Sequence, residues 1–301
     1  MKIIYSDEYY VDIGEHVFPT QKYKGVYEKL IKSNPALKDI IIKPIPASDE
    51  DVLLVHTKEY VQKLLTGTLS YEDILTLELP YSKQLVTASW LGAGGTIMAY
   101  RYAIKEGAGI NLAGGFHHAF SDHGEGFCVL NDIAIGVKKM QKEGLIKRVL
   151  ILDCDLHQGN GTAAIFANDP AVWTFSIHQE NNYPYYKPPG SLDIGLADGT
   201  GDEDYLKQMS THVPRIVKDF KPELIVYVAG ADTYEDDQLG GLNLTKEGLK
   251  RRDKFVFDLA KPNHIPVAGL LAGGYANDVN DTIEIHYNMV MEALGTVPFT
   301  G

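Results

Sequence analysis

The sequence RVLILDCDLHQGNG, residues 148–161, joins a strongly apolar run to a polar, glycine-rich turn. The apolar part, residues 148–152, has no polar alternation and is typical of a strand buried in a parallel sheet. Side chains alternate along a strand, so Asp153, Asp155 and His157 share one face if the extended geometry persists. Ligands of open α/β sheets lie at the carboxyl ends of the strands. The pattern therefore predicts a metal site, although a single aspartate there would more often only cap the next helix.

Three other apolar runs end in polar residues in the same way, namely residues 110–113, 224–229 and 267–271. The polar groups that follow them are, in order, His117 with His118, the acidic segment 232–237, and Tyr275. A histidine pair alone would more often be a surface feature or a satisfied core pair. Four polar strand ends at one edge of a sheet are harder to explain as packing, because buried polar groups must all find hydrogen-bond partners.

Helical patterns alternate with these runs, which favours an α/β fold with a parallel sheet and right-handed crossovers. Further strands are predicted at residues 1–6 and 40–42. Helices are predicted at 23–33, from 49 onward, and at 58–65, 82–105 and 130–143. The segment 179–204 is rich in Tyr, Pro, Gly and Asp and is predicted to be a long loop, which in a compact domain is usually functional.

Length and composition favour one globular enzyme domain, residues 1–301, because the chain has no linker, repeat or low-complexity tract. Its hydrophobic content of 45% and charged content of 23% are ordinary. The only two cysteines, Cys128 and Cys154, lie inside the site motifs, so a disulfide framework is not expected. No apolar stretch reaches the length of a membrane span, and we expect a cytoplasmic protein without a leader or a membrane segment.

The formal net charge of −12 disfavours direct binding of nucleic acid, which requires a basic surface. A negative field favours cationic substrates such as lysine-rich tails or polyamines. It is equally the ordinary charge of an acidic protein, so it does not choose a substrate.

Taken together, the motifs resemble the zinc-dependent histone deacetylase family, which has the arginase–deacetylase fold. The matching stretches are GGFHHAFSDHGEGFCVLND (114–132), LDCDLHQGNGT (152–162), WTFSIH (173–178), AGADTYEDDQLGGLNLT (229–245) and LAGGYA (271–276). The N-terminal third matches more loosely, through VHTKEYV (55–61). Gln158 and Asn160 are most similar to the class IV branch and its bacterial relatives. The resemblance implies a single α/β domain with a mostly parallel central sheet flanked by helices.

The resemblance also implies the metal and its ligands. Asp155, His157 and Asp237 are expected to hold Zn²⁺, which suits a catalytic site of three protein ligands and one open position. Fe²⁺ is possible in the same oxygen-rich set. Backbone carbonyls of the strand end, with one hydroxyl, are expected to hold K⁺ or Na⁺ beside the metal; the residues are Asp153, Asp155, His157, Ile177 and Ser176.

Proton transfer is assigned by the same resemblance to the two histidines. His117 is expected to pair with Asp153, and His118 with Asn160. An aspartate partner keeps His117 cationic, whereas an asparagine leaves the pKa of His118 nearer its ordinary value. His118 is therefore assigned as the general base and then the general acid, and His117 as an electrostatic stabiliser. Tyr275 is expected to donate a hydrogen bond to the oxyanion, its ring swung inward by a bend at Gly273 and Gly274.

Gly126 and Phe127 are expected to wall a narrow substrate channel, opposite one tyrosine of the segment 183–186. Flat aromatic walls suit the methylene chain of an acylated lysine. Near residues 79–81 we find no counterpart of the rim aspartate that grips the substrate backbone in class I enzymes.

These features predict a zinc-dependent deacylase that removes acetyl or longer acyl groups from N-ε-acyl-lysine. An acetylpolyamine amidohydrolase is the alternative within the same chemistry. A two-manganese ureohydrolase would need an aspartate where Gly159 stands. A non-catalytic reader of acyl-lysine would be expected to lack Tyr275 or a metal ligand, and the sequence keeps them.

Overall fold

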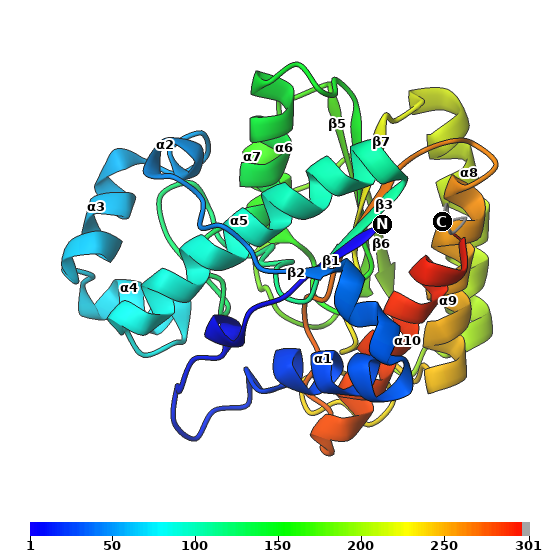
Figure 1. The fold of residues 1–301 in the computed structure, drawn as a ribbon, viewed down its shortest axis with the longest axis horizontal. Helices are drawn as coiled ribbons and strands as arrows, with labels where there is room; N and C mark the ends of the chain where they lie inside the picture. Colours follow the sequence, from blue (N-terminus) through cyan, green and yellow to red (C-terminus); the bar gives the residue numbers. More distant parts are fainter. Residues whose placement is uncertain (297–301) are drawn as a thin grey trace.

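A single sheet forms the centre of the computed structural model, which describes residues 1–296. Within the described residues the sheet has eight strands, all parallel, in the order β2-β1-β3-β8-β7-β4-β5-β6 (Figure 1). The strands are β1 (Lys2–Ile4), β2 (Ile41–Ile42), β3 (Ala108–Asn111), β4 (Val149–Asp153), β5 (Val172–Gln179), β6 (Leu192–Leu196), β7 (Leu224–Val228) and β8 (Val267–Leu270).

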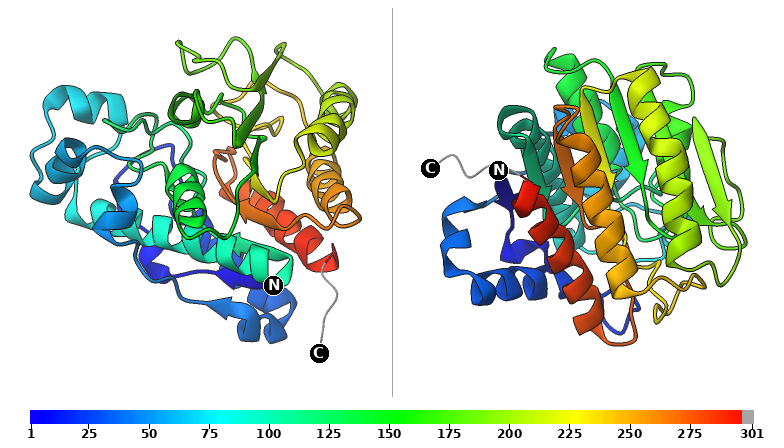
Figure 2. Two further views of the ribbon diagram at one scale, coloured as in Figure 1. Left: turned by 90° about the horizontal axis from the view of Figure 1, so that it is seen from above. Right: turned by 90° about the vertical axis from the view of Figure 1, so that its right-hand side faces the viewer.

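Helices cover both faces of the sheet, as a purely parallel sheet requires (Figure 2). One layer contains α5, α6 and α7, and the other contains α1, α10, α9 and α8, while α2 to α4 form a separate group beside α5. The helices are α1 (Lys22–Ser33), α2 (Asp49–Val52), α3 (Lys58–Thr66), α4 (Tyr71–Leu77), α5 (Lys83–Glu106), α6 (Asp132–Lys142), α7 (Asn160–Phe166), α8 (Asp202–Phe220), α9 (Lys246–Ala260) and α10 (Val279–Thr296).

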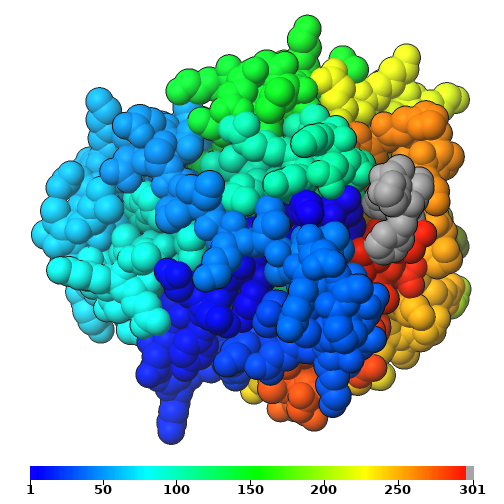
Figure 3. All heavy atoms as spheres, in the orientation of Figure 1, coloured from blue at the N-terminus to red at the C-terminus, as the bar shows by residue number. Residues whose placement is uncertain are grey.

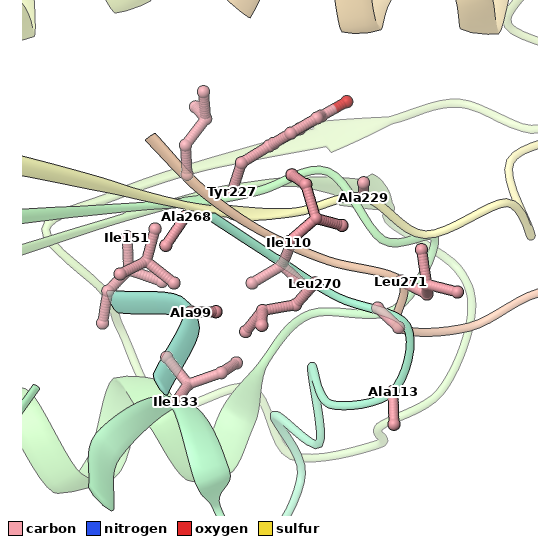
Figure 4. Close-up of a cluster of buried hydrophobic side chains, with 14 of the residues drawn as sticks. Ala99, Ile110, Ala113, Ile133, Ile151, Tyr227, Ala229, Ala268, Leu270 and Leu271 are labelled. Carbon is pink, nitrogen blue, oxygen red and sulfur yellow. The ribbon is translucent and has the colours of Figure 1, made fainter. Parts of the chain in front are cut away.

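The core lies between the sheet and each helix layer. Figure 4 shows Ala99 of α5 and Ile133 of α6 against one face of the sheet, while Tyr227 of β7 points to the opposite side. All five residues of β4 are buried, and the first four of them form an unbroken apolar run. The N-terminal third of the chain, blue to cyan in Figure 3, covers most of the face seen there.

The small residues of α5 allow this helix to pack closely on β3. The side-chain amide of Asn111, at the end of β3, donates a hydrogen bond to the Gly92 carbonyl at 3.1 Å. A larger side chain at residue 95 would collide with Tyr9 and Asn111. Ser82 caps the helix by accepting a hydrogen bond from the Leu85 amide.

The predicted α/β architecture is confirmed, and the predicted strands and helices agree with the observed ones within about two residues, the usual uncertainty of element ends. The segment 179–204 is a correction, because it contains the edge strand β6, which pairs with β5. Alternation of Leu192, Ile194 and Leu196 was the signal for a half-buried strand.

The last five residues of the predicted domain, 297–301, lie outside the described residues. Among the described helices none is long and apolar enough to span a membrane.

Candidate metal and catalytic site

Three buried side chains from two adjacent strand ends converge at the carboxyl edge of the sheet. Asp155 and His157 lie in the turn after β4, and Asp232 lies in the turn after β7. One ligand atom from each lies within 4.8 Å of the other two. Nδ1 of His157 is 3.3 Å from Oδ1 of Asp155 and 3.2 Å from Oδ2 of Asp232. We call these three residues the ligand cluster.

The expectation that Asp237 is the third ligand is wrong, because Asp232 occupies that position in the cluster. The carboxylate of Asp237 accepts hydrogen bonds from the backbone amides of Tyr275 at 2.7 Å and Leu239 at 2.9 Å. Asp237 therefore holds the turn that carries Tyr275. The strand register contained the missing signal: Asp153 is paired with Val228, so residues four positions further on, His157 and Asp232, meet.

The ligand cluster suits a divalent cation. Oδ2 of Asp232 is buried and forms no hydrogen bond of acceptable geometry, although Nδ1 of His157 lies 3.2 Å away. Its Oδ1 accepts a hydrogen bond from the Leu156 backbone amide at 3.0 Å. Burial and the neighbouring Asp155 raise the pKa of Asp232 to about 6. A cation would satisfy the unpaired oxygen and relieve the crowding of the carboxylates. Two carboxylates and one imidazole are a ligand set for zinc or iron.

Gly273 is required by this crowding. Its backbone amide donates to Oδ2 of Asp155 at 2.8 Å. A Cβ atom at this position would collide with the carboxylates of Asp155 and Asp232. The glycine therefore brings the chain that leads to Tyr275 directly against the ligand cluster.

His117 and His118 lie side by side and have the partners that the sequence predicted. Nδ1 of His117 is 2.7 Å from Oδ2 of Asp153, and Nδ1 of His118 is 2.7 Å from Oδ1 of Asn160. The two Nε2 atoms are 3.1 Å apart. We call His117 with Asp153, and His118 with Asn160, the two histidine dyads.

The two dyads differ in charge. Burial opposes the charged form of His117, but Asp153 and Asp155 raise its pKa to about 9, in the expected direction. Burial, with the positive charges of His117 and His157, lowers the pKa of His118 well below its ordinary value. The expectation that the pKa of His118 lies nearer its ordinary value is wrong, because it considered only the asparagine partner and not the burial and the neighbouring positive charges.

A cavity of about 170 Å³ leads to these groups, and it is lined by Glu78, His118, Gly126, Phe127, His157, Asn182, Tyr183, Leu239 and Tyr275. Gly126 and Phe127 thus lie in the cavity wall, as predicted from the sequence. The tyrosine of the opposite wall is Tyr183, whose ring meets His118 edge-on at a centroid distance of 5.0 Å. Tyr185 and Tyr186 are exposed.

Glu78 was missed by the sequence analysis. It lies immediately before the segment where we searched for an acidic rim residue, and it lines the cavity. Its left-handed backbone conformation, with φ of 57°, ends α4 and turns the chain there. Burial raises the pKa of its carboxyl group.

Lys22 was also missed, because a lysine in the first turn of an amphipathic helix is normally exposed. It is fully buried, and its Nζ donates to the Ala272 carbonyl at 2.6 Å. Nζ also lies 5.5 Å from the ring centre of Phe18 and 5.7 Å from that of Tyr275. Burial lowers the pKa of Lys22 to about 8, an effect opposed by the acidic residues of the site, first Asp232.

The residues expected to bind a monovalent ion lie together at the same strand end. Ser176 of β5 is paired with Asp153 of β4. The Ser176 hydroxyl is 2.9 Å from Nδ1 of His178, so it already has a partner. Binding of K⁺ or Na⁺ stays a prediction.

Comparison with known proteins decides the family. The sequence profile described as "Histone deacetylase domain" matches residues 16–290. The chain belongs to this family. Histone deacetylase 2 of Arabidopsis thaliana is 30% identical over 309 residues, covering 94% of this chain and 78% of that protein.

Other family relatives span similar shares of the chain. An uncharacterized protein of Picosynechococcus sp. is 38% identical over 285 residues, covering 94% of this chain and 95% of that one. The acetoin utilization protein AcuC of Bacillus subtilis is 32% identical and covers 80% of this chain and 68% of its own. The crystal structure of the HDA15 HD domain has the same fold, with a TM-score of 0.83 at 24% identity over 98% of this chain and 91% of that chain.

Proposed function

We propose that residues 1–301 form a single catalytic domain that hydrolyses N-ε-acyl-lysine in a zinc-dependent reaction and removes acetyl or other short acyl groups. The observation that carries this proposal is the convergence of three buried ligand groups beside one cavity, with His118 and Tyr275 in the cavity wall. Membership of the histone deacetylase family supports acyl-lysine as the substrate class.

Asp155, His157 and Asp232 are the residues that would hold the metal. Bound Zn²⁺ supplies Lewis-acid activation of water and of the amide carbonyl, and Fe²⁺ suits the same ligands. The backbone amides of Gly273 and Leu156 hold the two carboxylates in orientation by hydrogen bonds. Such outer partners usually matter for metal affinity.

The two histidine dyads divide the work of proton transfer. His118 has a low pKa, so its Nε2 is unprotonated at neutral pH and accepts the proton of the attacking water. The same nitrogen then returns the proton to the leaving amine. His117, held cationic by Asp153, stabilises the negative charge that develops beside it. The Tyr275 hydroxyl donates a hydrogen bond to the oxyanion.

The aromatic walls of Phe127 and Tyr183 support a substrate with an extended aliphatic chain. Each buried methylene group contributes roughly 0.8 kcal/mol to binding. Phe127 also lines a second, apolar cavity, whose volume is only about 40 Å³. For comparison, an engineered apolar cavity that binds benzene has a volume of about 150 Å³. This small volume favours acetyl over the long acyl chains that some class IV enzymes prefer.

We also infer that K⁺ or Na⁺ binds beside the ligand cluster. The carbonyls of Asp153, Asp155, His157 and Ile177 and the hydroxyl of Ser176 are the proposed ligands. The pairing of Asp153 with Ser176 across β4 and β5 supports this, because it brings two of these ligands to one strand end. A monovalent cation there would offset part of the local negative charge.

An acetylpolyamine is the second candidate substrate, and Glu78 is the observation that favours it. A carboxylate in the cavity wall can bind the secondary ammonium group of a polyamine. The same carboxylate can equally accept hydrogen bonds from the backbone amides of a peptide. Glu78→Gln should therefore weaken the binding of both substrates. The acetylpolyamine should lose more affinity than the peptide, because it carries a full positive charge.

The test is a panel of acetyl-, octanoyl- and myristoyl-lysine peptides with acetylspermidine, assayed with purified zinc-loaded protein. We expect kcat/KM to be highest for acetyl-lysine. A marked preference for acetylspermidine would overturn the substrate class. Tight binding of acetyl-lysine without turnover of any amide would instead make the protein a non-catalytic reader.

A further inference from the structure

Glu125 is a half-buried carboxylate that the proposed mechanism does not use, yet it contacts a member of the histidine dyads. Its Oε1 accepts hydrogen bonds from Nδ2 of Asn160 at 2.7 Å and from the Tyr183 hydroxyl at 2.9 Å. Its Oε2 lies 3.4 Å from Nε2 of His123. Reciprocal backbone hydrogen bonds with Cys128, of 3.1 and 2.9 Å, close the turn that carries Glu125. The carboxylate is therefore held in a defined place.

The Asn160 side chain has two chemically different ends, and each meets a different partner. Oδ1 faces Nδ1 of His118 at 2.7 Å and also accepts from the Gly161 amide at 3.0 Å. Nδ2 faces Glu125. An ionised carboxylate can only accept hydrogen bonds, so the end of the amide that faces it must be the NH₂ group. Two contacts, the Gly161 backbone amide at Oδ1 and the Glu125 carboxylate at Nδ2, therefore together decide which way the Asn160 amide points.

Glu125 is an anion at neutral pH. Burial alone would raise its pKa, but hydrogen bonds from His123, Asn160 and Tyr183 hold the pKa below its ordinary value. The acceptor character that orients the amide is therefore present under working conditions.

The orientation of the amide fixes the ring tautomer of the neighbouring histidine. When Oδ1 of Asn160 faces His118, Nδ1 carries the hydrogen and Nε2 keeps its lone pair. If the amide were reversed, Nδ1 would accept, Nε2 would carry the hydrogen, and His118 could not take a proton from water. We propose that Glu125 is a positioning residue that orients Asn160 and thereby sets the catalytic tautomer of His118. Its kinetic consequence rests on the function proposed above.

An aspartate at position 160 would not need this help, because either of its oxygens can accept from His118. It would, however, put a second carboxylate against Glu125, at the site of the present 2.7 Å contact. Two carboxylates so close repel one another and share a proton. Asn160→Asp should therefore be harmful when Glu125 is present and helpful when it is absent.

The experiment is a double-mutant cycle on the zinc-loaded protein. Glu125→Ala should lower kcat at least about tenfold, part of the 10²–10⁴ that a general base contributes, with zinc content unchanged. Asn160→Asp alone should also lower kcat. In the Glu125→Ala background, Asn160→Asp should raise kcat again, to within about threefold of the wild type. A cycle in which Asn160→Asp is equally harmful in both backgrounds would overturn the proposal.

Two further variants test whether the effect of Glu125→Ala comes from a change in the channel wall or from the loss of one negative charge. Tyr183→Phe removes the other hydrogen bond to Glu125 and should raise KM, with kcat kept within about twofold. If it reproduced the kcat loss of Glu125→Ala, the effect would belong to the wall and the proposal would fall. Glu180→Gln, which removes an exposed charge after β5, is the matched control and should leave both constants unchanged.

A readout that needs no catalysis is the nitrogen NMR spectrum of the His118 ring, which distinguishes the two tautomers. We expect hydrogen on Nδ1 in the wild type and a mixture in Glu125→Ala. An unchanged tautomer in Glu125→Ala would overturn the proposal. If the wild type hydrolysed no amide while the tautomer still depended on Glu125, the proposed function would fail and this inference would stand.

Discussion

The ligand cluster and the histidine dyads lie side by side, yet they accommodate buried polar groups in different ways. In the dyads each Nδ1 atom has its own acceptor, in both cases at 2.7 Å. In the ligand cluster the atoms converge on one another, and Oδ2 of Asp232 forms no hydrogen bond of acceptable geometry, even to the neighbouring Nδ1 of His157 at 3.2 Å. Burial of an unpaired polar group costs free energy. The comparison indicates that the dyads are complete within the chain, whereas the cluster is built for a cation.

The largest effect should come from the ligand cluster itself. Asp232→Ala removes one of three ligands, so we expect loss of bound zinc and of activity, because two remaining ligands hold zinc poorly. Asp237→Asn is the matched control, since it alters a carboxylate five residues away that bonds backbone amides. It should retain zinc, as measured by elemental analysis. The reverse pattern would restore Asp237 as the ligand.

Removal of the base from the dyads should leave the cluster intact. His118→Ala is expected to lower kcat by about 10²–10⁴ while zinc content stays at one per chain. His117→Ala should also lower kcat, by less, because it removes a charge rather than the proton acceptor. A His118→Ala protein with the turnover of the wild type would show that another group transfers the proton.

Removal of the oxyanion donor should have the next largest effect on kcat. Tyr275→Phe is expected to keep the fold and the metal and to lower kcat by about 10²–10³, the usual loss for one donor. The loss is measured by comparing kcat and KM of Tyr275→Phe with those of the wild type at saturating zinc. Normal turnover in this variant would assign the oxyanion to another donor.

The smallest predicted effect concerns a histidine that has no carboxylate partner. Burial lowers the pKa of His56 to about 4. Its Nε2 accepts a hydrogen bond from the backbone amide of Asn131 at 3.0 Å. Between pH 6.5 and about 4 the unfolded chain binds the proton and the folded chain does not. The contribution to stability is therefore complete above pH 6.5 and lost as the pH falls, at up to about 1.4 kcal/mol per pH unit.

His56→Gln provides the control, because an amide oxygen can accept the same hydrogen bond without titrating. Urea unfolding at pH 7 and pH 5 should show a smaller difference for this variant than for the wild type. An equal difference in the two proteins would mean that His56 is not the group responsible.

Much of the fold followed from local sequence. The apolar run before Asp153 predicted β4, and similar runs predicted β3, β7 and β8, because strands buried on both faces are nearly continuous apolar runs. The dyad partners Asp153 and Asn160 were predicted from motif resemblance, and the structure brings each to its histidine. The edge strand β6 was missed because its turn-rich flanks hid a short alternation.

The remaining errors have tertiary causes. Asp237 and Asp232 follow the same strand, and only the register of β4 against β7 distinguishes which of them reaches His157. Lys22 lies 250 residues from its acceptor, Ala272, so no local pattern could place it in the core. Glu78 turns into the cavity because α4 ends there in a left-handed conformation.

Anomalous diffraction at the zinc edge, measured on crystals of the zinc-loaded protein, tests directly whether Asp155, His157 and Asp232 hold a zinc ion. We expect one strong peak at about 2.0–2.2 Å from a carboxylate oxygen of Asp155, Nδ1 of His157 and Oδ2 of Asp232. A peak within bonding distance of Asp237 in place of Asp232, or no peak at this strand end, would contradict the assignment of these three ligands.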